Sequence, residues 1–163
     1  MVLSDTGRVF FWGQIYPCQS TARVPTEIEL PEPVTSISAG ETFVHLMTKS
    51  GAVYGFGYNG NGNLGDGTKI SRNVPVILPT SVKNKVRYMT TNYGQASITY
   101  LVYDTFIEAW GNVNPNYIIA KIDRTFKPIS TITAMGGRVK YIEYGNIFNA
   151  MLTEEGRVFT SGA

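Results

Sequence analysis

Short apolar segments, separated by turns rich in glycine and asparagine, recur along the chain. These segments carry mainly β-branched and aromatic residues, a composition that favours β-strands over helices. One set of predicted strands covers residues 43–48, 97–102 and 148–153. A second set covers residues 34–38, 86–90 and 139–143. The pattern therefore predicts an all-β protein.

A repeated motif links these strands: a turn, a short apolar strand and a closing glycine, which follows an aromatic residue in three of four copies. The closing glycines are Gly13, Gly57, Gly111 and Gly162. They lie 44, 54 and 51 residues apart, which gives a period near fifty. A second glycine precedes each of the last three by 17 residues, at Gly40, Gly94 and Gly145. Such a constant interval between two turns indicates a hairpin of fixed length, with variation confined to other loops.

Each of the first three closing glycines is followed by a loop and a proline-led apolar segment, at residues 25–28, 75–78 and 128–131. Proline has no N–H to donate, so we expect these segments on sheet edges. Four strands per unit, repeated about every fifty residues, predict a β-propeller. We expect a single arc of four-stranded antiparallel blades, with the first unit supplying only its third and fourth strands. The expected units are 1–33 (partial), 34–80, 86–131 and 138–163 (partial).

Composition and charge limit the classes of partner. The 163 residues are 43% hydrophobic and 16% charged, and the net charge of +2 comes without a run of like charges. This balance gives no strong signal for nucleic acid or a membrane surface as the main partner. The single cysteine, Cys18, cannot form an internal disulfide, and no signal peptide is visible at the start of the chain. We expect an intracellular protein, cytoplasmic or nuclear.

The glycine-rich loop after the second closing motif points to a known family. The string Gly62-Asn63-Leu64-Gly65-Asp66-Gly67, followed by Pro75, Asn92-Tyr93-Gly94 and Trp110-Gly111, resembles the repeat of the regulator of chromosome condensation family. Only the second unit carries the whole pattern, and the loops after Gly13 and Gly111 lack its glycine-rich element. The resemblance implies about three blades of a ring expected to have seven.

The resemblance also implies functions. We expect a protein-protein interaction scaffold without catalysis of its own, because family members serve as interaction domains. The alternatives that it implies are guanine-nucleotide exchange on a small Ran-like GTPase and association with chromatin. Self-association and continuation in a longer chain are both compatible with the open arc. The partner-binding residues are unknown, and the longest polar loop, residues 58–72, is the first target for mutagenesis.

No candidate for catalysis, cofactor binding or metal binding emerges from the motifs. Two glycine patterns, at 55–60 and 60–65, match the dinucleotide fingerprint, but a turn-like sequence follows them instead of a helix. Asn59, Asn61 and Asn63 lack the glycine and glutamate that a calcium loop needs. The remaining expectations are structural: a locally hydrogen-bonded strand residue for His45, solvated turn charges for Glu154 and Glu155, and blade-packing side chains for Trp12 and Trp110.

Overall fold

The computed structural model describes residues 1–14, 21–80, 86–91, 98–104, 107–111, 138–144 and 148–162. Every regular element within these ranges is a β-strand. The strands of the first half are β1 (Val2–Leu3), β2 (Val9–Gln14), β3 (Thr21–Ile28), β4 (Val34–Ala39), β5 (Phe43–Thr48), β6 (Val53–Gly57) and β7 (Arg72–Ile77). Those of the second half are β8 (Tyr88–Thr91), β9 (Ile98–Val102), β10 (Ile107–Gly111), β11 (Val139–Tyr144), β12 (Phe148–Thr153) and β13 (Val158–Gly162).

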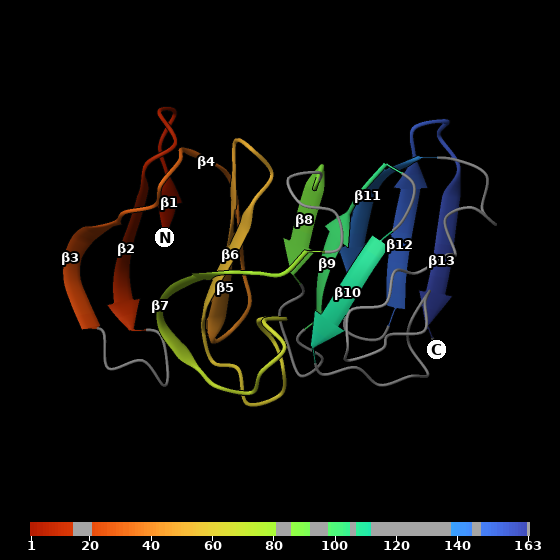
Figure 1. Ribbon diagram of the computed structural model, residues 1–163. Coiled ribbons are helices and arrows are strands. Elements are labelled where there is room, and N and C mark those ends of the chain that lie inside the picture. The colour runs from red at the N-terminus through yellow and green to blue at the C-terminus, as the bar shows by residue number, and fades with distance from the viewer. Residues whose placement is uncertain are drawn as a thin grey trace.

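The strands form four antiparallel sheets, each built from strands that follow one another in the chain. The orders are β1-β2-β3, β4-β5-β6-β7, β8-β9-β10 and β11-β12-β13. The sheets stand side by side across the molecule (Figure 1), and their first strands touch in succession: β1 with β4, β4 with β8, and β8 with β11. Blades arranged around their first strands are the architecture of a β-propeller, so the fold predicted from the repeats is confirmed.

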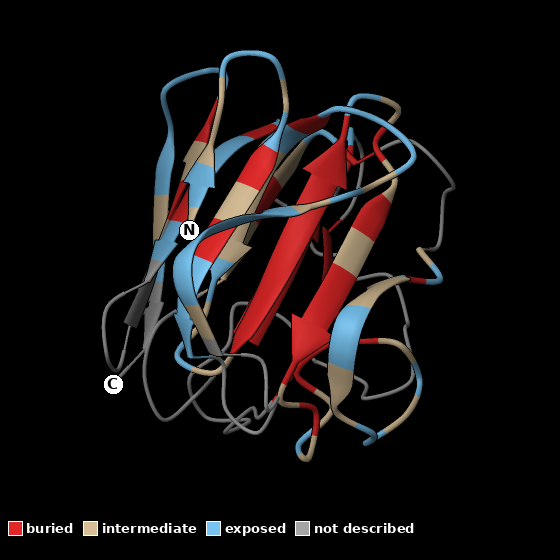
Figure 2. Ribbon diagram, turned by 90° about the vertical axis from the view of Figure 1, so that its left-hand side faces the viewer, coloured by how far each residue is buried: buried red, intermediate tan, exposed pale blue. Residues whose placement is uncertain are grey.

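Three hydrophobic clusters fill the spaces between consecutive sheets, and no residue belongs to two of them. The alternation of side chains along a strand allows this arrangement. On β9, Ile98, Tyr100 and Val102 face the fourth sheet, whereas Leu101 packs toward the second. Strands between two clusters are buried along their length, while edge strands and loops are exposed (Figure 2). These buried strands are mainly apolar, with single buried polar residues such as His45 on β5 and Thr99 on β9.

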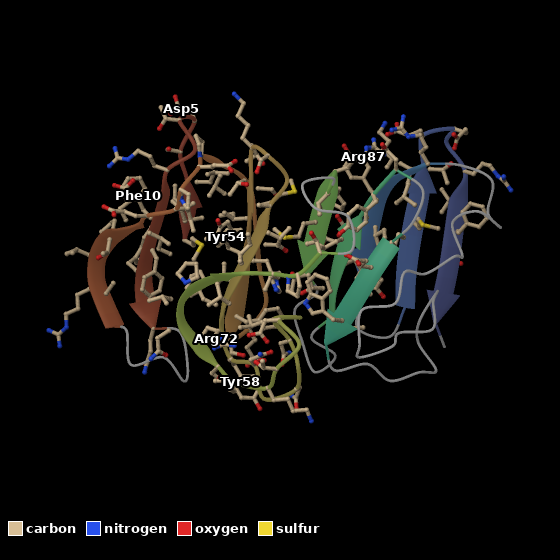
Figure 3. All side chains as sticks on the ribbon, viewed as in Figure 1. Asp5, Phe10, Tyr54, Tyr58, Arg72 and Arg87 are labelled. Atoms are coloured by element: carbon tan, nitrogen blue, oxygen red, sulfur yellow. The ribbon has the colours of Figure 1, made fainter. Side chains whose placement is uncertain are left out.

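Ion pairs connect the third and fourth sheets at one end of the molecule. Arg87 bonds Asp104 at 3.2 Å and Glu154 at 3.1 Å, and Arg138 also pairs with Asp104. Figure 3 shows Arg87 at the top of the molecule, at the end opposite Tyr58 and Arg72. Glu154 and Glu155 are exposed, as expected for turn charges, and Glu154 in addition pairs with Arg87.

Two details differ from the sequence-based expectation. The first unit contains a strand before its expected third strand, since β1 pairs with β2 through Val2 and Phe10. The proline-led segments do lie on edge strands, but Pro25 and Pro75 fall inside β3 and β7 instead of at their starts. Both edge strands also carry an irregularity in register. The third such segment, residues 128–131, lies outside the described residues.

Candidate protein-interaction site

The loop between β6 and β7, residues 58–72, is held by a buried asparagine. Asn59 is fully buried, and its Nδ2 donates to the Asp66 carboxylate at 2.9 Å and to the Thr68 and Ile70 carbonyls at 3.0 and 3.2 Å. Its Oδ1 accepts a bond from the backbone N–H of Leu64 at 2.9 Å. One side chain thus fixes the loop at four separate points.

Asp66 is the second anchor of this loop. Its side chain is 5% exposed and accepts two bonds from the Arg72 guanidinium, at 2.8 Å from Nε and 2.6 Å from the terminal nitrogen. The backbone N–H and hydroxyl of Thr68 donate to its other oxygen. Desolvation raises the pKa of Asp66, but the hydrogen bonds from Thr68, Arg72 and Asn59 outweigh it and hold that pKa below its ordinary value. The conformation of the loop is therefore held by its own hydrogen bonds and does not depend on a bound partner.

The anchored loop has an inner and an outer side. Leu64 is fully buried, and Asn63 is 2% exposed. On the outer side, Asn61, Gly67 and Lys69 are exposed, and the Ile70 residue is 62% exposed. From sequence, substitution of several residues of the 58–72 loop is expected to alter partner binding and leave folding intact. The structure restricts that expectation to the outer residues, because the inner ones form part of the core.

Trp110 of the third sheet packs directly on this loop. Its indole Nε1 donates to the Asn63 carbonyl at 3.0 Å. The indole also lies against Gly65, where an added Cβ would come within 2.4 Å of the ring. Gly65 also has a φ of 73°, so both its backbone conformation and the close contact with the indole require glycine. The loop of one blade is thereby locked to the next blade.

His45 on β5 lies next to this contact and joins the same two blades. Its Nε2 donates to the Leu64 carbonyl at 3.1 Å, and its Nδ1 lies 3.3 Å from the Thr99 hydroxyl on β9. The Thr99 hydroxyl is in turn 3.1 Å from that of Thr91. Because a carbonyl only accepts, the Nε2–H tautomer is assigned and Thr99 donates to Nδ1. Burial lowers the pKa of His45 to about 4 against the opposing effect of its bond to Leu64, so the ring is neutral.

A pocket of about 150 Å³ opens where this loop meets the third sheet. We call it the seam pocket. Among the described residues, six loop residues between Asn61 and Lys69 line it together with Trp110 and Gly111. Beside Gly67 the backbone is unshielded, since a Cβ added there would meet no atom within 4 Å.

The predicted roles of single residues had mixed outcomes. Trp110 packs between blades as expected, at 3% exposed, but the same prediction is wrong for Trp12, which is 44% exposed. His45 is a strand residue, yet its bonds are not local, because they reach Leu64 and Thr99, which lie 19 and 54 positions away. Cys18 lies outside the described residues.

The other motifs show no chemistry of their own in the described part of the chain. Gly55 and Gly57 of the first glycine pattern lie in β6, and a loop, not a helix, follows them. Among the described residues, no group of three or more His, Cys, Asp or Glu side chains could hold a metal ion. No helix in those ranges is long and apolar enough to cross a lipid bilayer.

Comparison with known proteins identifies the repeat. Residues 50–91, which include the anchored loop, match the model of the regulator of chromosome condensation (RCC1) repeat. The chain carries an RCC1 repeat. Over 142 residues it is 26% identical to the human regulator of chromosome condensation, covering 85% of this chain and 33% of that protein. The mouse protein is 25% identical over the same length. The chain thus spans about a third of the length of these curated relatives.

Solved structures of similar fold cover nearly all of the chain. Human WBSCR16 matches with a TM-score of 0.74 and 21% identity over 98% of this chain and 44% of that one. Prp20p from Saccharomyces cerevisiae, studied with its binding to Gsp1p and histones, matches with a TM-score of 0.71 and 19% identity over 100% and 43%. Yeast RCC1 (Prp20) with bound Kap60 gives a TM-score of 0.75 and 13% identity over 98% and 39%. These matches show that the RCC1 repeat here lies in an arc of RCC1-like β-propeller fold.

Proposed function

We propose that this protein is an interaction scaffold that binds a protein partner through the outer side of the 58–72 loop and performs no catalysis of its own. The observation that carries the proposal is the combination of a fixed loop with exposed apolar residues. Asn59 and Asp66 hold the loop internally, while the Ile70 residue stands 62% exposed at its outer side. A preformed loop loses little conformational entropy when a partner docks.

The adjoining edge strand extends this surface. Val74 and Ile77 on β7 are 66% and 58% exposed, so the strand that follows the loop also carries exposed apolar side chains. Pro75 lies between them and has no N–H for a further strand to use. Exposed apolar side chains on an edge that resists strand addition favour docking through side chains.

Gsp1p, histones and Kap60 make a defined test panel, because Prp20p has been studied for its binding to Gsp1p and histones and its structure has been solved with Kap60. Binding of the purified chain to each would be measured by biolayer interferometry. We expect Ile70→Asp to weaken the binding of at least one panel member about tenfold or more, because hot-spot residues contribute 2 kcal/mol or more. Val158→Asp is the matched control, since Val158 is 66% exposed on the fourth sheet. A role for the loop would be contradicted if the two substitutions weakened binding equally, or if neither substitution weakened it.

Nucleotide exchange on a Ran-like GTPase is the second candidate function. The similarity to Prp20p, which has been studied with Gsp1p, favours it. The release of a fluorescent GDP analogue from Gsp1p separates the two functions. Accelerated release would assign exchange activity to the chain, whereas binding without acceleration fits a scaffold.

A further inference from the structure

The size of the seam pocket limits what it can hold. Its volume of about 150 Å³ is below the roughly 300–1,000 Å³ of typical small-molecule sites. It is also roughly ten times the volume that one water needs. A pocket of this size suits one amino-acid side chain and is too small for a nucleotide or a large cofactor.

Two backbone N–H groups at the pocket have no hydrogen-bond partner in the described structure. Gly67 and Lys69 both line it, and neither backbone N–H forms a hydrogen bond with any part of the chain that the structure describes. Gly67 has a φ of 76° and no side chain, so a ligand can approach its backbone closely. Backbone N–H groups in such turns form concave sites for anions.

The charge at the pocket also favours an anionic ligand. Lys69 is exposed and is the one ionisable side chain among the lining residues that the structure describes. The nearby Asp66 does not cancel this charge, because Arg72 already pairs with it through two bonds. An uncompensated ammonium beside unused N–H donors favours a carboxylate over an amide or a cation.

We propose that the seam pocket binds a glutamate or aspartate side chain presented by an acidic segment of a protein partner. This inference rests on the proposed scaffold function and names the chemistry of its partner. The carboxylate lies near Lys69 and the N–H groups of Gly67 and Lys69, and its methylene stem packs toward the Trp110 side of the pocket. Since the indole is fixed by Asn63 and Gly65, the pocket is present before the partner arrives.

A phosphate backbone fits this site less well than a carboxylate. Nucleic-acid binding without sequence recognition depends on several Lys and Arg contacts along the strand. Of the described lining residues, Lys69 alone is basic, and the whole chain has a net charge of +2. An acidic protein segment is therefore the occupant that the charges favour.

Two-dimensional nitrogen–proton NMR of the full 163-residue chain tests the proposal. The probe is N-acetyl-glutamate N′-methylamide, with the glutamine analogue and a single-stranded oligonucleotide as comparison probes. We expect saturable shifts of the Gly67 and Lys69 amide signals and of the Trp110 indole signal with the glutamate probe alone. Equal shifts with the glutamine probe, or tighter binding of the oligonucleotide, would overturn the proposal.

Two variants locate the binding at the pocket. Lys69→Gln should weaken the glutamate probe up to about fivefold, the range expected for an exposed ion pair. Lys49→Gln is the control: Lys49 is exposed in the β5–β6 turn, which Figure 1 shows at the end opposite the 58–72 loop, and it should change nothing. Asn61→Trp should block the pocket mouth and abolish the shifts. An unchanged affinity in both Lys69→Gln and Asn61→Trp would refute the assignment.

The failure of this inference is distinguishable from failure of the proposed function. If Ile70→Asp weakens a panel partner but the glutamate probe does not bind, the loop is an interaction surface and the pocket is not its acidic subsite. If the probe binds and Ile70→Asp has no effect on any partner, the pocket recognises carboxylates and the scaffold proposal for the loop fails.

Discussion

The neutral, buried His45 should make the stability of this fold fall below neutral pH, and His45→Gln should remove that dependence. The pKa of His45 is about 4 in the folded chain, against 6.5 for an ordinary histidine. Because the folded state disfavours the proton, the stabilisation is complete above pH 6.5 and is lost as the pH falls toward 4. Linkage gives a loss of about 2.5 kcal/mol between about pH 7.5 and 4.5.

Urea unfolding of the wild type and His45→Gln at both pH values measures this loss. Trp110 reports the transition by fluorescence, because its ring lies 5.8 Å from that of His45. Carboxylates also titrate in this range, so the quantity of interest is the difference between the two proteins in their pH-dependent loss of unfolding free energy. We expect the wild type to lose about 2.5 kcal/mol more than the variant. Parallel losses in both proteins would refute the assignment of the pH dependence to His45.

Three further predictions concern the anchored loop and its seam. Gly65→Ala should lower the unfolding free energy in urea by about 3 kcal/mol, since it combines backbone strain with a clash against Trp110; a loss below about 1 kcal/mol would contradict the close contact. Asn59→Ala should cost about 3 kcal/mol in the same assay because it leaves several buried polar groups without partners, and a near-neutral result would count against the asparagine as anchor. Acrylamide should quench the fluorescence of Trp12 more strongly than that of Trp110. The first is measured in the variant Trp110→Phe and the second in Trp12→Phe, and equal quenching would conflict with their different exposure.

The strands were predictable from sequence because their signals are local. The fixed interval from Gly40 to Gly57 marks a hairpin, and the apolar runs on either side give the remaining strands. The short β1 was missed because two residues are too few to show a pattern. Proline revealed that β3 and β7 are edge strands but did not mark their first residues, because an edge position can accept proline anywhere along its unpaired side.

The contacts at the candidate site could not be read from the sequence to the same degree. Thr99 lies 54 positions from His45, the same interval as from Gly57 to Gly111, so the repeat places both at equivalent positions. The repeat does not show that the two side chains meet. Trp12 and Trp110 occupy equivalent repeat positions, yet their exposure differs. Within the described structure, a glycine-rich loop packs against Trp110 but not against Trp12. A repeat pattern specifies the position in a blade, whereas burial depends on the neighbouring blade.

The separation of the hydrophobic clusters has a consequence for folding and for sequence change. Each sheet is coupled to its immediate neighbours, so the described arc behaves as a linear chain of units with nearest-neighbour energies. Substitutions in the cluster around Val44 and those around Ile142 should then contribute additively to stability. The residues packed between one pair of blades can therefore change independently of those between another pair, while the spacing of glycines keeps the blades alike. This independence accounts for a chain in which one repeat retains the full RCC1 pattern and its neighbours, held in the same architecture, do not.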